Sequence, residues 1–553
     1  RRHPRLTSSG SVAAVAALLL LAAGAGVAGL REHLAHAEEQ LTAVAARDQK
    51  QAFEAGVLQV LCLVNTTLES HDHLRAGVSA CEKTLNIYGL LAGDSWQEPI
   101  SWAQLAEEER HRLAEDAREL LLLLAGARVR LSGGDPVVLQ QALALLDRAE
   151  AIGGLEPSQA LWRDRANYLE QLGENARAAT ARQRAESIPA TSARDHYQLA
   201  STYARQGTST GYAQAIAELN EALRLNPRHF WSCIQRGLCQ QELGNLVQAA
   251  GDFGRCIGLW PEFAWSYFNR GYILDQNGQK TAAIDDYTAA LERDPQFVPA
   301  YVNRGLAYLQ CKQPARALAD FQKAAALGKD DASLHASRGM ALEALGRAAE
   351  ADAAFDTAFG RAAVLPEPAR LRLRWTYGFA VANRLPQKAR EAFNAVLRQE
   401  PRHPQALYGR AFLAVQAEQA ELALRFLDQA LEADPNLVDA RRTRALVLSR
   451  LGQLERASQD INWCLDHEPR QSATLYTAAC VAARVAERYA DAQAAEKALL
   501  LLQKALAQGA AADKVADDPD LAGLRAHPKF QQLIAQWSAA RSRTESELHG
   551  DAK

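Results

Sequence analysis

Apolar and polar residues follow one another along most of the chain with the spacing of amphipathic helices, and the pattern repeats. Between Ala264 and Gln296, a first helix is followed by the turn Asn277-Gly278 and a second helix. In the second helix, Ala283, Tyr287 and Ala290 lie four and three residues apart, so they share one face. The stretch therefore predicts two helices that pack against each other through this face.

Four arginine-glycine pairs recur at an interval of 34 residues, and an alanine and an aromatic residue follow each pair with the same phase. This period is typical of a solenoid of stacked helix pairs. We expect the small residues to let the two helices of a unit cross closely, with each glycine touching the alanine of its own unit. A larger side chain at Gly271 would cost roughly 1–3 kcal/mol through overpacking. The repeat-structural residues are Gly237, Gly271, Gly305, Gly339, Ala249, Ala283, Ala317 and Ala351.

These residues resemble the tetratricopeptide repeat (TPR), whose units carry an early aromatic residue, a large–small pair, and then Ala, an aromatic, Ala and Pro. The departure is arginine where the family prefers leucine; we expect its stem to pack against a neighbour and its head to reach water. The resemblance implies an all-α TPR solenoid, a right-handed superhelix of helix hairpins. About nine units fit residues 194–509, and weaker TPR-like hairpins fit residues 136–189.

Charge and cysteine content narrow the function. The chain has 62 Lys and Arg against 65 Asp and Glu, a net charge of −3, which gives nucleic-acid binding little electrostatic support. Its eight cysteines show no zinc-ligand spacing, so we predict no metal and no cofactor. Cys311 and Cys464 fall on core positions, as do Cys233 and Cys256, which lie on the two helices of one hairpin and could pair.

Residues 12–30 are uncharged and consist of Ala, Val, Leu and Gly, which is long enough for a transmembrane helix. Arginines precede it in a basic stub, residues 1–11, so the positive-inside rule predicts a single-pass membrane protein with a cytoplasmic N-terminus and extracytoplasmic repeats. The alternative is a signal peptide. Ala25 and Gly29 form a small-xxx-small pair that could support a homodimer through this segment.

The remaining segments suggest a second resemblance. Residues 31–131 form a helical juxtamembrane region, with Leu120–Leu124 as a buried helix face, and residues 510–553 form a capping helix and a polar tail. The order of stub, span, helical region, TPR units and closing segment is similar to the C-terminal half of membrane-anchored bacterial serine/threonine protein kinases. The chain has no Gly-rich phosphate loop, His-Arg-Asp or Asp-Phe-Gly motif, so we predict that it is not an enzyme.

The function that we predict is protein–protein interaction. The chain is interpreted as a non-catalytic scaffold or sensor region, part of a membrane-anchored serine/threonine protein kinase; the alternative is a standalone TPR protein that assembles envelope complexes. Mixed apolar and amide side chains on the first helices would suit a polypeptide ligand of unknown identity. The predicted peptide groove consists of Phe268, Asn269, Tyr272, Asp275, Gln276, Val302, Asn303 and Leu306. Packing between units is an equally good interpretation of Phe268 and Tyr272.

Overall fold

The computed structural model of the chain describes residues 9–65, 71–93, 96–97, 100–508 and 515–537; the side chains of residues 9–35 lie outside this description. By their contacts the residues form two units, each described here by itself. The first unit is Arg1–Asn277 with Glu292–Asp294, and the second is Gly278–Leu291 with Pro295–Lys553.

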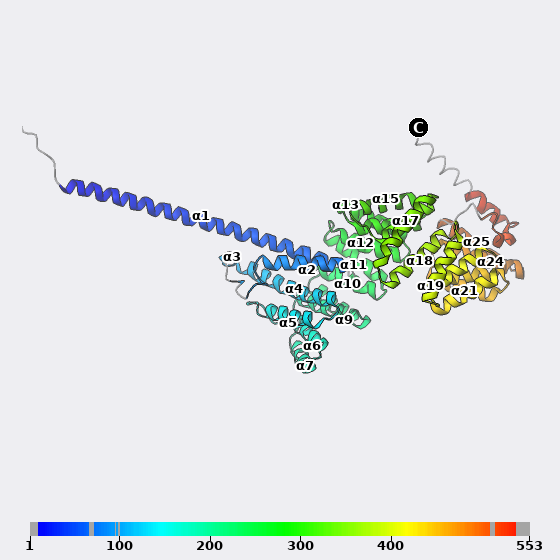
Figure 1. Ribbon diagram of the computed structural model, residues 1–553, viewed down its shortest axis with the longest axis horizontal. Helices are drawn as coiled ribbons and strands as arrows, with labels where there is room; N and C mark the ends of the chain where they lie inside the picture. The colour runs from blue at the N-terminus through cyan, green and yellow to red at the C-terminus, as the bar shows by residue number, and fades with distance from the viewer. Residues whose placement is uncertain (1–8, 66–70, 94–95, 98–99, 509–514, 538–553) are drawn as a thin grey trace, which may run out of the picture. The chain divides into compact units, whose positions relative to one another are not determined.

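The regular elements of the described residues are all helices, and no strand occurs among them (Figure 1). The first unit contains α1 (Ser9–Asn65), α2 (His71–Asn86), α3 (Ile100–Ala103), α4 (Glu107–Ser132), α5 (Pro136–Glu150), α6 (Gln159–Gln171), α7 (Asn175–Glu186), α8 (Ala193–Ala204), α9 (Ser209–Leu225), α10 (Phe230–Glu242), α11 (Leu246–Leu259) and α12 (Ala264–Gln276).

The division between the units falls within α13 (Lys280–Arg293). The second unit continues with α14 (Val298–Gln310), α15 (Pro314–Ala326), α16 (Ala332–Ala344), α17 (Ala348–Arg361), η1 (Ala362–Val364), α18 (Glu367–Val381), α19 (Pro386–Gln399), α20 (Pro404–Gln416), α21 (Ala420–Ala433), α22 (Val438–Arg450), α23 (Leu454–His467), α24 (Ser472–Tyr489), α25 (Ala492–Ala507) and η3 (Pro519–Leu524). Residues 528–537 are also helical.

Consecutive helices pack as antiparallel pairs in both units. The pairs α8/α9 and α10/α11 pack in the first unit; the second contains α14/α15, α16/α17, α18/α19, α20/α21, α22/α23 and α24/α25. Local chemistry sets their ends: Asp331 caps α16 by accepting the Leu334 amide at 2.8 Å. Gly346 takes the left-handed φ of 72° that ends the same helix, whereas Lys312 takes this conformation (φ 57°) at the corresponding turn. All-helical, TPR solenoid-like architecture is thus confirmed, while the superhelix handedness stays a prediction.

The N-terminal region of the first unit has its own core. Helix α1 packs one face, including Phe53 and Val57, against α2, α3 and α4. Leu120–Leu124 of α4 are all buried, as the sequence predicted. The opposite face of α1 stays in solvent, where Leu41 is 70% and Val44 52% exposed.

The predicted membrane localisation is corrected. No helix within the part of the chain that the structure describes combines the length and apolar character needed to cross a bilayer. Residues 12–30 do not form a helix of their own but the start of α1, which runs on into Arg31, Glu32 and the charges beyond. The single-pass topology, the orientation derived from it and the homodimer through this segment are therefore withdrawn.

Candidate functional site

In the hairpins α10/α11, α14/α15 and α16/α17, the glycine of the first helix packs against an aromatic ring of the second helix. A Cβ built at Gly305 would lie 2.6 Å from the Phe321 ring, and the ring is fully buried. The same contact, at 2.8 Å, joins Gly237 to Phe253 and Gly339 to Phe355. The nearest neighbour of each glycine is therefore the ring, rather than the alanine that we expected. The alanines Ala249, Ala283, Ala317 and Ala351 are fully buried, and Gly271 is buried too.

The repeated arginines hold neighbouring helices together. The Arg304 guanidinium donates from Nε (2.9 Å) and Nη2 (2.7 Å) to the two carboxylate oxygens of Asp320, on the second helix of its own pair. Its Nη1 donates to the Thr288 hydroxyl at 3.0 Å, on the preceding second helix. The Asp320 side chain is 8% and the Arg304 side chain 16% exposed, and hydrogen bonding to the carboxylate raises the pKa of Arg304. The expectation that the head reaches water was wrong, because a buried carboxylate binds it.

The same arginine bridge occurs in two further repeats in which an aspartate follows the arginine by 16 residues. Arg236 bridges Asp252 and Asn220, and Arg444 bridges Asp460 and Asp428. The recurring aspartate is visible in the sequence and could have predicted the bridge. The bridge fixes a first helix between two second helices. It thereby also fixes the position of the opposite side of that first helix.

The predicted groove residues are divided between the units. Phe268, Asn269, Tyr272, Asp275 and Gln276 lie on α12 of the first unit, and Val302, Asn303 and Leu306 lie on α14 of the second. Phe268 and Asn269 are buried and Tyr272 packs on the core around Phe253, whereas Gln276 is exposed. Val302, Asn303 and Leu306 are half-buried. The burial of Phe268 and the packing of Tyr272 favour the packing interpretation for these two, and a continuous groove stays a prediction.

A half-buried aromatic strip lies on α18 and α20 of the second unit. Phe379 is its centre: its ring centroid lies 6.1 Å from Trp375, 5.5 Å from Tyr408 and 6.4 Å from Phe412. Phe379 also contacts the buried Phe393 ring at 5.0 Å, which anchors the strip to the core. Sequence reasoning missed this strip because it lies after the slip in the 34-residue period. We call Trp375, Phe379, Tyr408 and Phe412 the aromatic strip.

Polar groups border the aromatic strip. At the ends of α18 and α20, the exposed Gln416 amide donates to Asn383 Oδ1 at 2.5 Å. The Tyr408 hydroxyl lies 3.4 Å from the Thr443 hydroxyl, and burial raises the pKa of Tyr408. The Arg372 side chain is exposed on α18. Ring faces beside amides and a guanidinium offer stacking area together with hydrogen-bond donors and acceptors.

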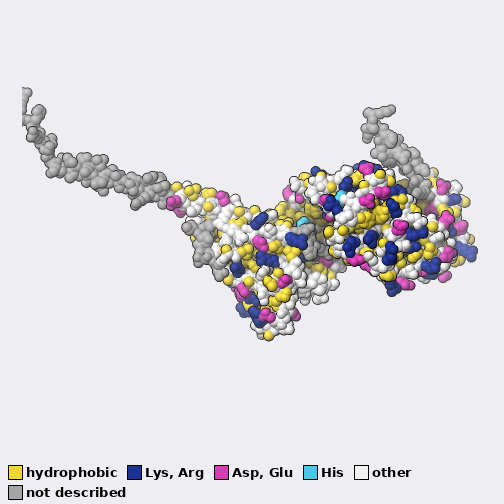
Figure 2. Space-filling model, in the orientation of Figure 1, with side chains coloured by type: hydrophobic (Ala, Val, Ile, Leu, Met, Phe, Trp, Pro, Cys, Tyr) yellow, Lys and Arg dark blue, Asp and Glu magenta, His cyan; other side chains and the backbone are white. Residues whose placement is uncertain are grey.

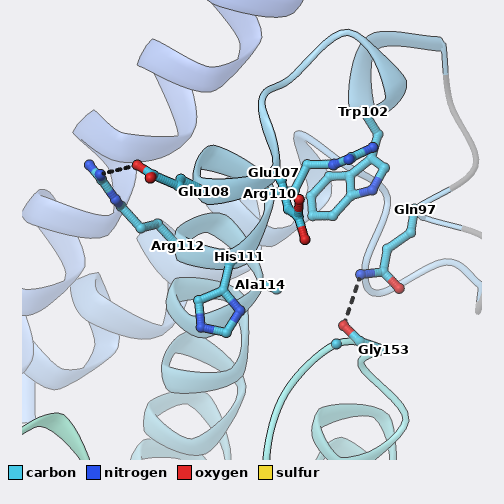
Figure 3. A pocket seen from close by; sticks show the side chains of 10 residues that line it. Gln97, Trp102, Glu107, Glu108, Arg110, His111, Arg112, Ala114 and Gly153 are labelled. Carbon is cyan, nitrogen blue, oxygen red and sulfur yellow. Dashed lines mark hydrogen bonds and ion pairs between the residues drawn. The ribbon is translucent and has the colours of Figure 1, made fainter. Parts of the chain in front are cut away.

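The largest pocket described lies elsewhere, in the first unit, and has a volume of about 640 Å³. Trp102 and His111 line it, beside Gln97, whose amide faces the Gly153 carbonyl at 3.5 Å (Figure 3). Its charged groups pair within one helix, as Arg112 does with Glu108 at 3.5 Å, and both side chains are largely exposed. The pocket therefore shows no set of fixed, convergent polar groups of the kind that orients a small ligand.

The described residues form no site that is arranged for metal or redox chemistry. No group of three or more His, Cys, Asp or Glu among them could hold a metal ion. All eight cysteines are free thiols; burial raises the pKa of Cys62 and Cys239 to about 12, which makes them poor nucleophiles. Cys233 and Cys256 are both fully buried, and the Cys256 thiol lowers the pKa of Cys233. Figure 2 shows Lys and Arg interspersed with Asp and Glu on the visible face.

Comparison with known proteins gives four family matches, each described as a tetratricopeptide repeat, at residues 264–297, 287–319, 380–438 and 414–499. No curated protein sequence matches the chain. The matched models indicate repeats and no catalytic domain.

Solved structures similar to the chain include the following three. A crystal structure of MamA protein is 20% identical, covers 31% of this chain and 91% of its own, and has a TM-score of 0.29. YrrB, described as a TPR protein with an unusual peptide-binding site, is 26% identical over 35% of this chain and 98% of its own, with a TM-score of 0.24. Yeast Tom70 is 15% identical over 82% of this chain and 98% of its own, with a TM-score of 0.41. TM-scores of this size establish no common overall shape. The four family matches, together with the stacked helix pairs, show that the chain contains tetratricopeptide repeats at residues 264–319 and 380–499.

Proposed function

We propose that the chain is a non-catalytic scaffold that binds a polypeptide partner through the first helices of its repeats, with the aromatic strip as the main contact in the second unit. The observation that carries this proposal is the partial exposure of four clustered rings beside exposed amides. Binding energy at such surfaces concentrates in a few aromatic anchors, each worth roughly 2 kcal/mol or more on truncation. The groove residues Val302, Asn303 and Leu306 on α14 remain part of the proposed surface.

The test is selection of peptides from a displayed random library against the full chain, followed by affinity measurements on variants. Tyr408→Ala and Phe412→Ala should each weaken the selected peptides by roughly 30-fold, the equivalent of about 2 kcal/mol. The matched control is Trp463→Ala on α23, a half-buried ring that stacks on His467 at 3.7 Å outside the strip. Selected peptides that bind all three variants as tightly as the unmodified chain would contradict the proposal.

Association with a serine/threonine protein kinase is a second, separate proposal. It is supported by the order of helical region, TPR units and closing segment. Sequencing the gene upstream of Arg1 tests it: a Gly-rich loop followed by a His-Arg-Asp motif supports the association, and a coding region without them contradicts it.

A further inference from the structure

The closing segment of the chain folds back onto the first helices of the last two repeats. Its short 3-10 turn, η3, packs against α24. Leu521 and Leu524 are 0% and 1% exposed and belong to the same core cluster as Ala479, Cys480 and Ala483 of α24. Asp518 begins the turn by accepting the Asp520 amide at 2.8 Å. The segment thus presents two leucines, three residues apart, to the surface of the repeats.

A buried carboxylate fixes the segment in this position. The Asp520 side chain is 1% exposed and lies between two guanidiniums from different helices. Arg450, at the end of α22, donates from Nη2 at 2.6 Å and from Nε at 3.0 Å. Arg484 of α24 donates from Nε at 2.8 Å. Hydrogen bonds of this type offset the cost of removing a carboxylate from water, because both partners are charged and aligned.

The receiving surface carries two guanidiniums, which face the carboxylates of Asp520 and Asp518. The Arg450 and Arg484 side chains remain 41% and 28% exposed with the segment in place. Beside them the Tyr476 hydroxyl donates to Asp518 Oδ2 at 2.5 Å. Two guanidiniums and a phenol beside an apolar surface can together bind an acidic segment that contains leucines. We give the name arginine face to Arg450, Arg484 and Tyr476 together with the apolar α24 residues Ala479, Cys480 and Ala483.

We propose that the arginine face is a docking site for acidic segments of the pattern Asp-x-Asp-Leu-x-x-Leu, which residues 518–524 occupy in cis and for which a partner protein competes. The inference rests on the proposed scaffold function and specifies the chemistry of the partner segment that the scaffold binds. The occupant is suited to exchange, since a single 3-10 turn has few internal hydrogen bonds and depends on Asp520 and the two leucines for its position. Because it is tethered, it competes at an effective concentration in the millimolar range.

The experiment uses the full chain and a fluorescent synthetic peptide of residues 515–530 as the probe. The unmodified chain should bind the peptide weakly, because the site is occupied. Asp520→Lys removes the competitor in cis, and the peptide should then bind at least roughly tenfold more tightly. Arg450→Glu with Arg484→Glu, added to Asp520→Lys, should abolish binding of this peptide, because the reversed charges repel its carboxylates.

Two measurements keep the outcomes distinct. Lys529→Glu is the control, because it breaks an exposed ion pair with Glu496 (2.7 Å) at the other end of the closing segment and should leave peptide binding unchanged. Asp520→Asn, which keeps the size of the side chain, and Asp520→Lys are both compared with the unmodified chain by circular dichroism. Folded variants that bind the peptide no better than the unmodified chain overturn the inference, and so does loss of helix content in both, since the segment would then be part of the fold. Library-selected peptides that depend on Tyr408 and Phe412 are unaffected by these variants, so the scaffold proposal is judged separately.

Discussion

Hairpins α14/α15 and α18/α19 lie in the same unit and hold their first helices in opposite ways. In α14 the position before the packed glycine is Arg304, which an ion pair with Asp320 fixes. In α18 the same position is Tyr377, whose ring packs edge-on against Phe355 at 5.1 Å and Phe359 at 5.3 Å on α17. A polar bridge in one hairpin is therefore replaced by aromatic packing in the other.

The spacing of the packed residues explains the exchange. Gly305 and its ring, Phe321, are 16 residues apart, whereas Gly378 and its ring, Phe393, are 15 apart. A guanidinium–carboxylate bridge needs donor and acceptor within about 3 Å and in line, so a shift of one residue breaks it. Ring packing is less directional and tolerates the shift. The comparison teaches that the polar bridge needs the regular spacing, whereas the packing of glycine on a ring does not.

The largest expected effect comes from removing the bridge. Arg304→Ala leaves the Asp320 carboxylate buried without its partner and should lower the free energy of unfolding by about 3 kcal/mol. The matched control is Arg338→Ala in α16, where Ala354 stands at the aspartate position and the described contacts include no ion pair or hydrogen bond of the guanidinium. It should cost less than about 1 kcal/mol. If Arg304→Ala and Arg338→Ala lower the free energy of unfolding equally in urea denaturation, the bridge does not stabilise the fold.

Building a bridge where none exists would sharpen the comparison. Ala354→Asp places a carboxylate at the offset from Arg338 that Asp320 has from Arg304, in a site that is 8% exposed. The substitution should be tolerated beside Arg338 and should destabilise the Arg338→Ala background. In a double-mutant cycle we expect a coupling free energy of about 2 kcal/mol between the two positions. Additive effects would mean that the 16-residue offset alone does not make the bridge.

The glycine-on-ring packing is common to both hairpins and should respond equally in both. Gly305→Ala and Gly378→Ala each place a Cβ against a buried ring, at 2.6 and 2.7 Å, and should each cost roughly 1–3 kcal/mol. Gly360→Ala is the control, since this glycine of α17 has nothing within 4 Å of an added Cβ. It should stabilise the chain by roughly 0.5–1 kcal/mol through helix propensity. Thermal melting of the three variants distinguishes packing from propensity.

The smallest effect concerns pH and the histidines that begin α10 and α20. Desolvation lowers the pKa of His229 to about 4 and lowers that of His403 as well. A depressed pKa in the folded state means that acid protonates the unfolded chain first, so stability falls as the pH drops from about 6.5 towards 4. His229→Asn keeps a side chain that can accept the Ser232 amide hydrogen bond and removes this titration. Its melting temperature should fall less between pH 7 and pH 5 than that of the unmodified chain; an identical fall contradicts the assignment.

Sequence could predict the parts of the molecule that depend on local periodicity. Gly237 and Phe253 predict a close helix crossing, because the sizes of these two side chains alone decide how closely the helices approach. Asp252 carries a readable signal as well, since it keeps its offset from Arg236, but the arginine was interpreted by itself. Asp520 could not be linked to Arg450 and Arg484, which lie 70 and 36 residues away with no repeated pattern between them. Such contacts arise from how the chain folds back, and a period does not encode that.

The arginine bridge also has a mechanical consequence. Each bridging arginine binds an aspartate on the second helix of its own pair and a polar side chain on the preceding second helix. A pulling force along the second unit must therefore break a polar bridge to part α13 from α15 or α21 from α23. Around α16–α19, where Arg338 meets Ala354 and Tyr377 replaces the arginine, this bridge is absent. There Arg384, in the turn after α18, binds Glu343 of α16 and Asp352 of α17 instead. Under tension the middle of the second unit would therefore depend on Arg384 and on packing, whereas its two ends are held by the repeated bridges.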